Sequence, residues 1–248
     1  MNKPIAIIAG EPNSISSEII FKSWNLRKKY KHKPFFIIGS FDLLELQKKK
    51  LKFNFKIKKI NNNFKIEDLK TSELPVYNIN YKQKKAFEDI STKSNKYILK
   101  CFYYALKFAK RKVISGIINC PISKETLFKN NHQGITEFIS KKNKTKGKEV
   151  MLIYNKKLSV APITTHMELK KVSGSLSERK IVEKLITINK FYLKNFKIKP
   201  KIGILGLNPH NNELREGSEE KTIIMPAIKK LKKRKISIYG PLSPDTAF

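Results

Sequence analysis

Two histidines in this sequence each lie shortly after an apolar run, a position typical of binding and catalytic side chains. His210 lies in a turn-forming segment, 208–212, that follows the apolar run 201–205. His166 follows a second apolar run, 158–163. If both runs are strands of a parallel sheet, both imidazoles come to the carboxyl ends of strands, where ligands of α/β proteins bind. Together they could hold a divalent metal; the alternative is a pair of loop histidines that only form hydrogen bonds.

The segment around His210 also differs from the rest of the chain in charge. The chain is crowded with lysine, but residues 208–220 contain none. They hold instead four glutamates, Glu213, Glu216, Glu219 and Glu220. This composition separates the segment from the lysine-rich surface expected elsewhere and marks it as a candidate site.

The apolar runs that would position these histidines alternate with helical patterns. Runs typical of buried strands occupy residues 5–9, 35–39, 113–119, 158–163, 201–205 and 236–239. Helical periodicity or helix-start signals favour helices over residues 16–26, 41–46, 97–109, 175–191 and 223–231. This alternation predicts an α/β fold with a largely parallel sheet sandwiched by helices. No G-x-G-x-x-G segment follows a strand, so the sequence does not support a Rossmann cofactor site.

Length and composition predict a globular protein without a membrane segment. The chain has 248 residues, of which 40% are hydrophobic, enough for one large domain or two modest ones. It contains no apolar run of about 18 residues, and its first apolar run stops at residues 10–12, too early for a signal peptide. The two cysteines, Cys101 and Cys120, form no CxxC pair, so we expect no disulfide framework and a reducing, cytoplasmic setting.

The formal net charge of +33 raises the question of a nucleic-acid or anionic-surface partner. Only five of the basic residues are arginine, the side chain with which nucleic-acid-binding proteins usually contact bases and phosphates directly. The lysines are spread from end to end with many Asn and Ile residues, which indicates a compositional drift that produces solvated surface lysines. We therefore expect no nucleic-acid partner, although a small anionic substrate would benefit from the positive field. A non-catalytic basic binding protein is the alternative from a different class.

Short motifs are spread over the whole chain. They are GEP at 10–12, CPISKE at 120–125, GITEF at 134–138, TTHMELKKV at 164–172, GLNPHNNE at 206–213, EE at 219–220, PAI at 226–228 and GPLSPDTAF at 240–248. Together they resemble one enzyme family, the 4-hydroxythreonine-4-phosphate dehydrogenases of vitamin B6 biosynthesis. They occur in the family's order, and GLNPH with TTH upstream and GP-x-x-x-DT-x-F downstream is a specific combination.

The resemblance implies a fold like that of isocitrate and isopropylmalate dehydrogenases, with two subdomains, at about 1–133 and 134–248, around a cleft. It implies a homodimer whose active site lies near the subunit interface. It also implies NAD- or NADP-dependent oxidation of 4-phosphohydroxy-L-threonine, a small phosphorylated hydroxy amino acid, at its secondary alcohol, followed by loss of CO2 from the β-keto acid. A divalent metal, Zn²⁺, Co²⁺ or Mg²⁺, would lower the pKa of the substrate hydroxyl and then polarise the ketone.

The resemblance also implies roles for individual residues of this chain. His166 and His210 match the family's metal ligands, and Thr136 matches a substrate-contacting position. Lys124 and Asp245 lie in motif loops at strand ends, which places them in or beside the site as catalytic candidates. A surface lysine and a helix-capping aspartate are the alternatives for these two residues.

Three departures from the family pattern bear on the site. Ser14 and Ser16 replace glycines in the loop after the first strand, where close backbone approach favours glycine. Ile135 replaces the family's substrate-binding histidine, which keeps open a related substrate, a phosphorylated four-carbon sugar acid. The family continues past the DTAF of residues 245–248 with a third metal histidine. The chain therefore resembles a family member cut short at its C-terminus, and we expect its metal site to lack one ligand.

Overall fold

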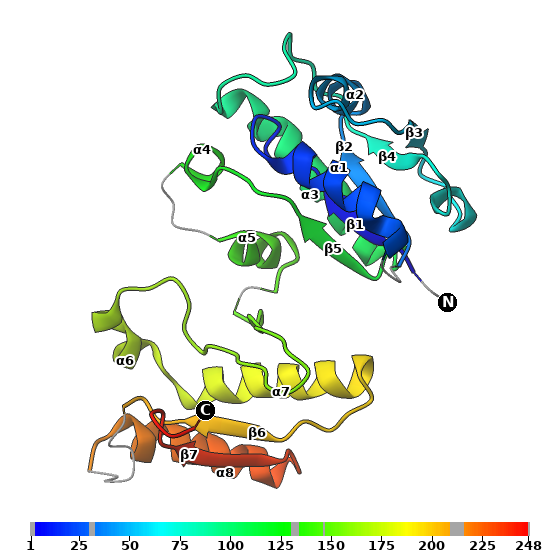
Figure 1. Ribbon diagram of the computed structural model, residues 1–248. Coiled ribbons are helices and arrows are strands. Elements are labelled where there is room, and N and C mark those ends of the chain that lie inside the picture. Colours follow the sequence, from blue (N-terminus) through cyan, green and yellow to red (C-terminus); the bar gives the residue numbers. More distant parts are fainter. Residues whose placement is uncertain (1–2, 30–32, 130–133, 146, 209–215, 248) are drawn as a thin grey trace. The chain divides into compact units, whose positions relative to one another are not determined.

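The computed structural model describes residues 3–29, 33–129, 134–145, 147–208 and 216–247. The chain divides into two units, Met1–Asn131 and His132–Phe248, which we call unit 1 and unit 2. Strands and helices alternate in both units, so the predicted α/β class is confirmed (Figure 1). Among the described residues, no helix is both long and apolar enough to span a membrane.

Unit 1 is built on a five-stranded parallel sheet in the order β3-β4-β2-β1-β5. Its strands are β1 (Ile5–Ile8), β2 (Phe35–Gly39), β3 (Ile57–Ile60), β4 (Leu74–Asn78) and β5 (Gly116–Asn119). β1 lies between two partners, with Ile5 opposite Phe35 of β2 and opposite Gly116 of β5. The loops that follow β1 and β5 therefore leave the same edge of the sheet as neighbours.

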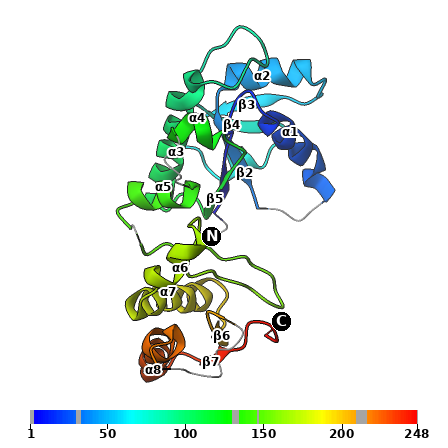
Figure 2. The same cartoon turned by 90° about the vertical axis from the view of Figure 1, so that its left-hand side faces the viewer.

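Helices cover both faces of this sheet, because its strands carry apolar side chains on both sides (Figures 1 and 2). One face carries α1 and α2 and the other carries α3. Ile37 of β2 packs with Trp24 of α1, whereas the adjacent Phe36 meets Phe108 of α3 edge-on, with 5.7 Å between ring centroids. The helices of unit 1 longer than one 3₁₀ turn are α1 (Ser16–Leu26), α2 (Phe41–Lys50), α3 (Asn95–Lys110) and α4 (Lys124–Phe128).

Unit 2 contains a parallel strand pair, β6 (Ile202–Leu205) and β7 (Ile238–Leu242), with Ile202 opposite Ile238. Two helices pack against each other and against this pair, in a core that includes Leu185 of α7, Ile204 of β6 and Leu231 of α8. The α-helices of this unit are α5 (Ile135–Lys142), α6 (Val172–Ser175), α7 (Glu178–Asn195) and α8 (Met225–Lys233). The predicted strand near 201–205 is thus confirmed as the element that leads toward His210.

Residues 158–163 do not form the strand that their apolar pattern predicted. In this stretch only Val160 pairs, in a single antiparallel bridge with Ile153. Ser159 Oγ donates to Asn155 O at 3.0 Å and tightens the turn of this short hairpin. Leu158 and Val160 are exposed, whereas Ala161 and Ile163 are partly buried and pack against the core of unit 2. The prediction was wrong because a short apolar run has the same pattern in a buried strand and in an exposed hairpin.

The core of unit 1 makes a testable prediction about its cysteines. Cys101 in α3 and Cys120 after β5 are free and buried. Burial raises the pKa of Cys101 to about 12 and the pKa of Cys120 to about 11. Because the thiolate is the reactive form, we expect both thiols at pH 8 to react with a disulfide reagent about a hundredfold more slowly in the native protein than in guanidinium. Rapid labelling of either thiol in the native state would contradict this burial.

Candidate functional site

The loops that follow β1 and β5 are joined to each other by hydrogen bonds. Glu11 N donates to Pro121 O at 2.8 Å, and Ser16 Oγ donates to the same carbonyl at 3.2 Å. Gly10 has a φ of 75° and lies so close that a Cβ on it would collide with this carbonyl oxygen. Glycine is therefore required at the point where these two motif loops meet.

Ser14 and Ser16, which replace family glycines, close the loop after β1 on itself. Ser14 Oγ donates to Glu11 O at 2.8 Å and lies 2.8 Å from Ser16 Oγ. Ser16 N in turn donates to Ser14 Oγ at 3.2 Å. The two hydroxyls thus satisfy polar groups of the loop and fix the start of α1, which glycines at these positions could not do.

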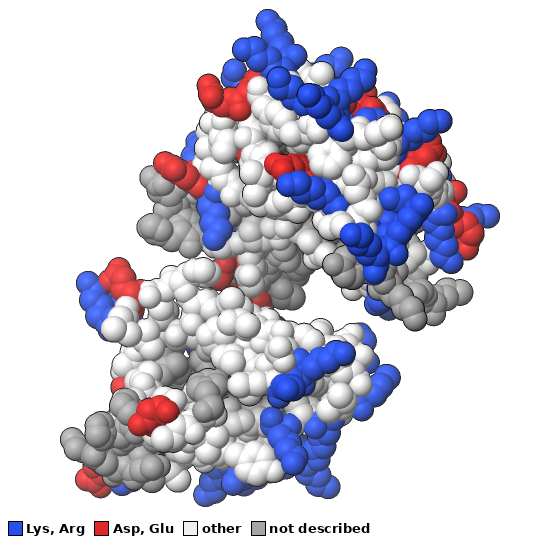
Figure 3. Space-filling view, viewed as in Figure 1, with Lys and Arg blue, Asp and Glu red and all other residues white. Residues whose placement is uncertain are grey.

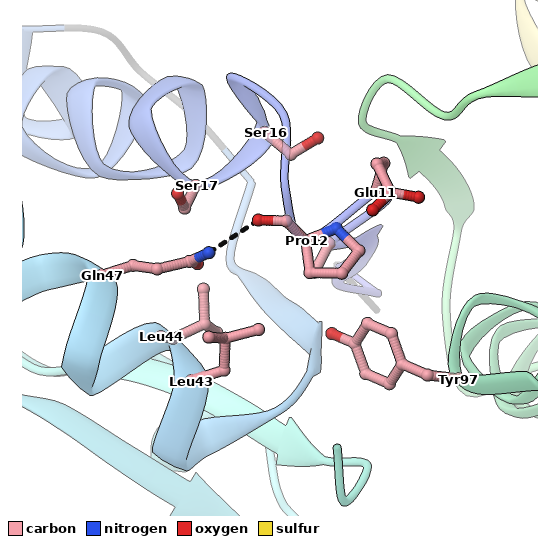
Figure 4. Close-up of a pocket in the computed structure, with 9 residues that line it drawn as sticks. Glu11, Pro12, Ser16, Ser17, Leu43, Leu44, Gln47 and Tyr97 are labelled. Carbon is pink, nitrogen blue, oxygen red and sulfur yellow. Dashed lines mark hydrogen bonds between the residues drawn. The ribbon is translucent and has the colours of Figure 1, made fainter. Parts of the chain in front are cut away.

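A fully buried glutamate and a small cavity lie beside this loop (Figure 4). The carboxylate of Glu11 accepts hydrogen bonds from Ser94 Oγ at 2.8 Å and from Asn13 N at 3.2 Å. The cavity has a volume of ≈ 10 Å³ and is lined by residues of α1, α2 and α3. One of these, Ser17, has a buried hydroxyl with no partner in the described part of the chain. A cavity of this size holds about one water molecule and is too small for a substrate or a nicotinamide.

Lys124 and Asp245 are both exposed, and each lies a few residues after a strand. Lys124 begins α4, the short helix after β5, which Ser123 caps. Asp245 follows β7 in a turn, where its carboxylate accepts a hydrogen bond from Ser243 Oγ. The catalytic roles of both residues stay predictions.

His166 lies beside the start of α5 in unit 2. Its backbone has a φ of 52°, in the left-handed region, and the residue is exposed. Its Nε2 atom lies 3.6 Å from the point where a Cβ on Gly134 would stand. Gly134 is the N-cap residue of α5, so Ile135 and Thr136 form the first turn of that helix. The structure therefore brings three predicted site residues, His166, Ile135 and Thr136, into one neighbourhood.

Glu137 is a candidate that the sequence interpretation missed, although it follows Thr136 directly. A Cβ on Gly134 would collide with Glu137 Oε2. This oxygen and His166 Nε2 therefore both lie close to Gly134. The oxygen is buried and has no hydrogen-bond partner among the described residues. An unpartnered buried carboxylate oxygen costs free energy. A cation would satisfy it, since carboxylate oxygen and imidazole nitrogen are both ligands of zinc and cobalt.

A buried polar network holds α5 in place. Ser140 of α5 donates from Oγ to Glu149 Oε2 at 2.7 Å. Lys184 of α7 is also buried; that burial lowers its pKa, Lys180 lowers it further, and Glu149 and Glu137 partly offset the shift. Carboxylates associated with α5 thus interact with a lysine of α7. This network connects α5, whose first turn holds Thr136 and Glu137, to Glu149 and to α7.

His210, the second predicted metal ligand, lies outside the described residues. Within the ranges that the structure describes, no three His, Cys, Asp or Glu side chains gather closely enough to hold a metal ion. His166 and Glu137 supply two donors of suitable chemistry. The pairing of His166 with His210 stays a prediction.

Comparison with known proteins gives these features a family context. The family of the pyridoxal phosphate biosynthetic protein PdxA matches residues 31–248, most of the chain. A 4-hydroxythreonine-4-phosphate dehydrogenase from Sulfurihydrogenibium is 36% identical over 98% of this chain and 75% of the relative. The enzyme of that name from Aquifex aeolicus is 37% identical over 100% of this chain and 76% of the relative. A D-threonate 4-phosphate dehydrogenase from Salmonella typhimurium is 29% identical, over 99% and 76% respectively.

A solved structure shows the same fold. It is described as a 4-hydroxythreonine-4-phosphate dehydrogenase from Salmonella typhimurium and matches with a TM-score of 0.86 at 27% identity, over 100% of this chain and 77% of that one. Enzymes of this kind have the isocitrate/isopropylmalate dehydrogenase-like fold, so that prediction is confirmed. The chain therefore belongs to the PdxA family of pyridoxal phosphate biosynthetic proteins, oxidoreductases with a role in vitamin B6 biosynthesis.

Proposed function

We propose that this protein oxidises 4-phosphohydroxy-L-threonine at its secondary alcohol with NAD or NADP, in the cytoplasm, and that the β-keto acid then loses CO2. The observation that carries the proposal is family membership over most of the chain, together with relatives of this name at 36% and 37% identity. The grouping of His166 with the first turn of α5 supplies a place for the chemistry.

Within this proposal, His166 and His210 hold a divalent metal, Zn²⁺, Co²⁺ or Mg²⁺. The buried, unpartnered Oε2 of Glu137 beside His166 supports a cation at this place. When bound, such a metal supplies Lewis-acid stabilisation of negative charge on the substrate oxygen. The chain's own part is to hold the substrate there, and the exposed Thr136 offers its hydroxyl for that contact.

Lys124 and Asp245 are proposed to act in or beside the site. Each is exposed and lies shortly after the carboxyl end of a parallel strand, β5 for Lys124 and β7 for Asp245. Ligands of such sheets bind at this end of the strands. An ammonium there suits a phosphorylated substrate, and a carboxylate there could accept or return a proton.

A dehydrogenase of a phosphorylated four-carbon sugar acid is the second candidate. Ile135 at the start of α5 favours it, because isoleucine cannot make the hydrogen bond that a histidine would offer to the amino-acid substrate. The Salmonella typhimurium relative at 29% identity is named for a substrate of that kind, D-threonate 4-phosphate. The choice between the two substrates therefore depends on the first turn of α5.

A role as a basic binding protein has less support. Lys and Arg side chains are scattered over the face shown in Figure 3, with neutral surface between them. Nucleic-acid binding usually needs basic side chains gathered in one patch or stripe. The charge therefore agrees better with solvated lysines around an enzyme of the family.

We also propose a homodimer, as the family resemblance implies, with the hairpin 151–160 in its contact. Large apolar side chains that are exposed together on one segment mark an interaction site. This hairpin exposes five of them: Met151, Ile153, Tyr154, Leu158 and Val160.

The substrate assignment is tested by following cofactor reduction with Co²⁺ present. We expect a higher kcat/KM with 4-phosphohydroxy-L-threonine than with 4-phospho-D-threonate. We expect His166→Ala to lower kcat/KM about a hundredfold or more, because metal Lewis acidity contributes several kcal/mol to such a reaction. His32→Ala changes a histidine outside the family motifs; it is the matched control and should keep the parent rate. A clear preference for the threonate would replace the first candidate with the second.

Glu137 can be tested through metal binding alone. We expect Glu137→Gln and Gly134→Ala each to weaken Co²⁺ binding about tenfold, since the first removes the carboxylate and the second displaces it. Gly116→Ala is the matched control, because a Cβ there meets no atom within 4 Å. Visible absorption of bound Co²⁺ is the measurement. Unchanged affinity in Glu137→Gln would exclude this carboxylate from the cation site.

The dimer is tested by sedimentation velocity at several protein concentrations. We expect Ile153→Asp to shift the protein toward monomer, because it places a charge in a desolvated apolar contact. Ile90→Asp is the matched control: Ile90 is 47% exposed, Ile153 is 57% exposed, and Ile90 lies in unit 1. Equal dimer content in both variants and the parent would remove the hairpin from the interface.

A further inference from the structure

Two polar side chains with unused hydrogen-bonding capacity line the small cavity beside the loop after β1. Ser17 of α1 is 3% exposed, and its hydroxyl has no partner in the described part of the chain. Gln47 of α2 is 2% exposed. Its Nε2 atom donates to Pro12 O at 2.7 Å and to Ala86 O at 3.0 Å, whereas no described residue donates to its Oε1 atom. A hydroxyl and an amide oxygen that could each bind more therefore border one cavity.

These two side chains do not satisfy each other directly. Figure 4 shows Ser17 and Gln47 on the same side of the cavity, but within the described ranges no hydrogen bond joins them. A buried hydroxyl or carbonyl without a partner costs free energy. A small group between them that can both accept and donate a hydrogen bond would remove that cost.

The cavity has the size and the polar lining that a water molecule needs. Its volume of ≈ 10 Å³ is about that of one water-sized sphere, and a buried water makes two to four hydrogen bonds. Tyr97 of α3 supplies a third polar group, because its Oη atom accepts from Ser40 N at 3.0 Å and can accept a second bond. Leu43 and Leu44 line the cavity as well, so a water there is restricted to one place.

The charge of the lining favours a neutral ligand over a cation. Glu11 is the only charged residue of the lining, and its carboxylate already accepts hydrogen bonds from Ser94 Oγ and Asn13 N. In Figure 4 this carboxylate lies on the other side of Pro12 from Gln47. The other polar groups around the cavity are uncharged hydroxyls and an amide.

We propose that one buried water molecule binds in this cavity, where it accepts a hydrogen bond from Ser17 Oγ and donates one to Gln47 Oε1. Its second hydrogen points to Tyr97 Oη. Since Gln47 also holds Pro12 and Ala86, the water links the start of α1 to α2, to the loop after β1 and to the segment that follows β4. The loop after β1 is therefore held from inside unit 1 by a solvent molecule, whichever substrate the protein takes.

A high-resolution crystal structure of the parent protein tests the site directly. We expect one ordered water whose oxygen lies about 2.5–3.0 Å from both Ser17 Oγ and Gln47 Oε1. A dry cavity, or a direct hydrogen bond between the two side chains, would overturn the proposal.

Thermal unfolding tests whether the water couples the two residues. We expect Ser17→Ala to lower the midpoint by about 3–6 °C, because it leaves a buried polar partner unsatisfied. Ser23→Ala, an exposed change in the same helix, is the matched control and should unfold within about one degree of the parent.

The same change is then made in a Gln47→Met background, where the bridge is already lost. There we expect Ser17→Ala to lower the midpoint by less than about a third as much, since residues that share a partner are not additive. Equal losses in both backgrounds would show that the hydroxyl acts without Gln47 and would contradict the bridge. If Gln47→Met does not fold, the crystal structure of the parent decides the question alone.

Discussion

Buried carboxylates hold the chain where the strand pairing ends, and the loops of both units depend on them. Past β1, Glu11 accepts hydrogen bonds from Asn13 N and Ser94 Oγ. Past β6, Glu220 accepts one from Leu207 N. Burying a carboxylate is costly, but charge-assisted bonds to amides and hydroxyls offset that cost and fix the loop geometry. The stretches of chain directly after β1 and β6 are therefore held in place before any ligand binds.

The elements that sequence patterns identified best are strands formed by short, continuous apolar runs. Continuous apolar runs predicted β1, β2 and β5, because a parallel sheet covered on both faces requires them. β4 was missed because Pro75 argues against an internal strand. Leu74 N bonds to Lys56 O on the β3 side, so Pro75 turns its nitrogen toward β2, where pairing begins only at Val76. A proline is tolerated here because its nitrogen faces a point where β4 and β2 are not yet paired. The strand propensities of the residues do not reveal this.

From the sequence, only those residues of the candidate site that lie in short motifs could be predicted. His166 and Thr136 could be identified from their short segments, and the structure places both beside Gly134. Glu137 could not, because its significance comes from a buried oxygen without a partner, a property of the folded chain. The acidic composition of 208–220 drew attention to Glu220, but only the fold shows which amide it binds.

The lysine-rich surface has a colloidal consequence. In the described part of unit 2, β6 and β7 form a two-stranded pair, and unpaired strand edges can template association between copies. The exposed hairpin 151–160 adds an apolar surface with the same tendency. A net charge of +33 opposes both through mutual repulsion. That repulsion reaches about 10 Å at 0.1 M salt and about 3 Å at 1 M, so the solubility of the protein should depend on ionic strength far more than its fold does.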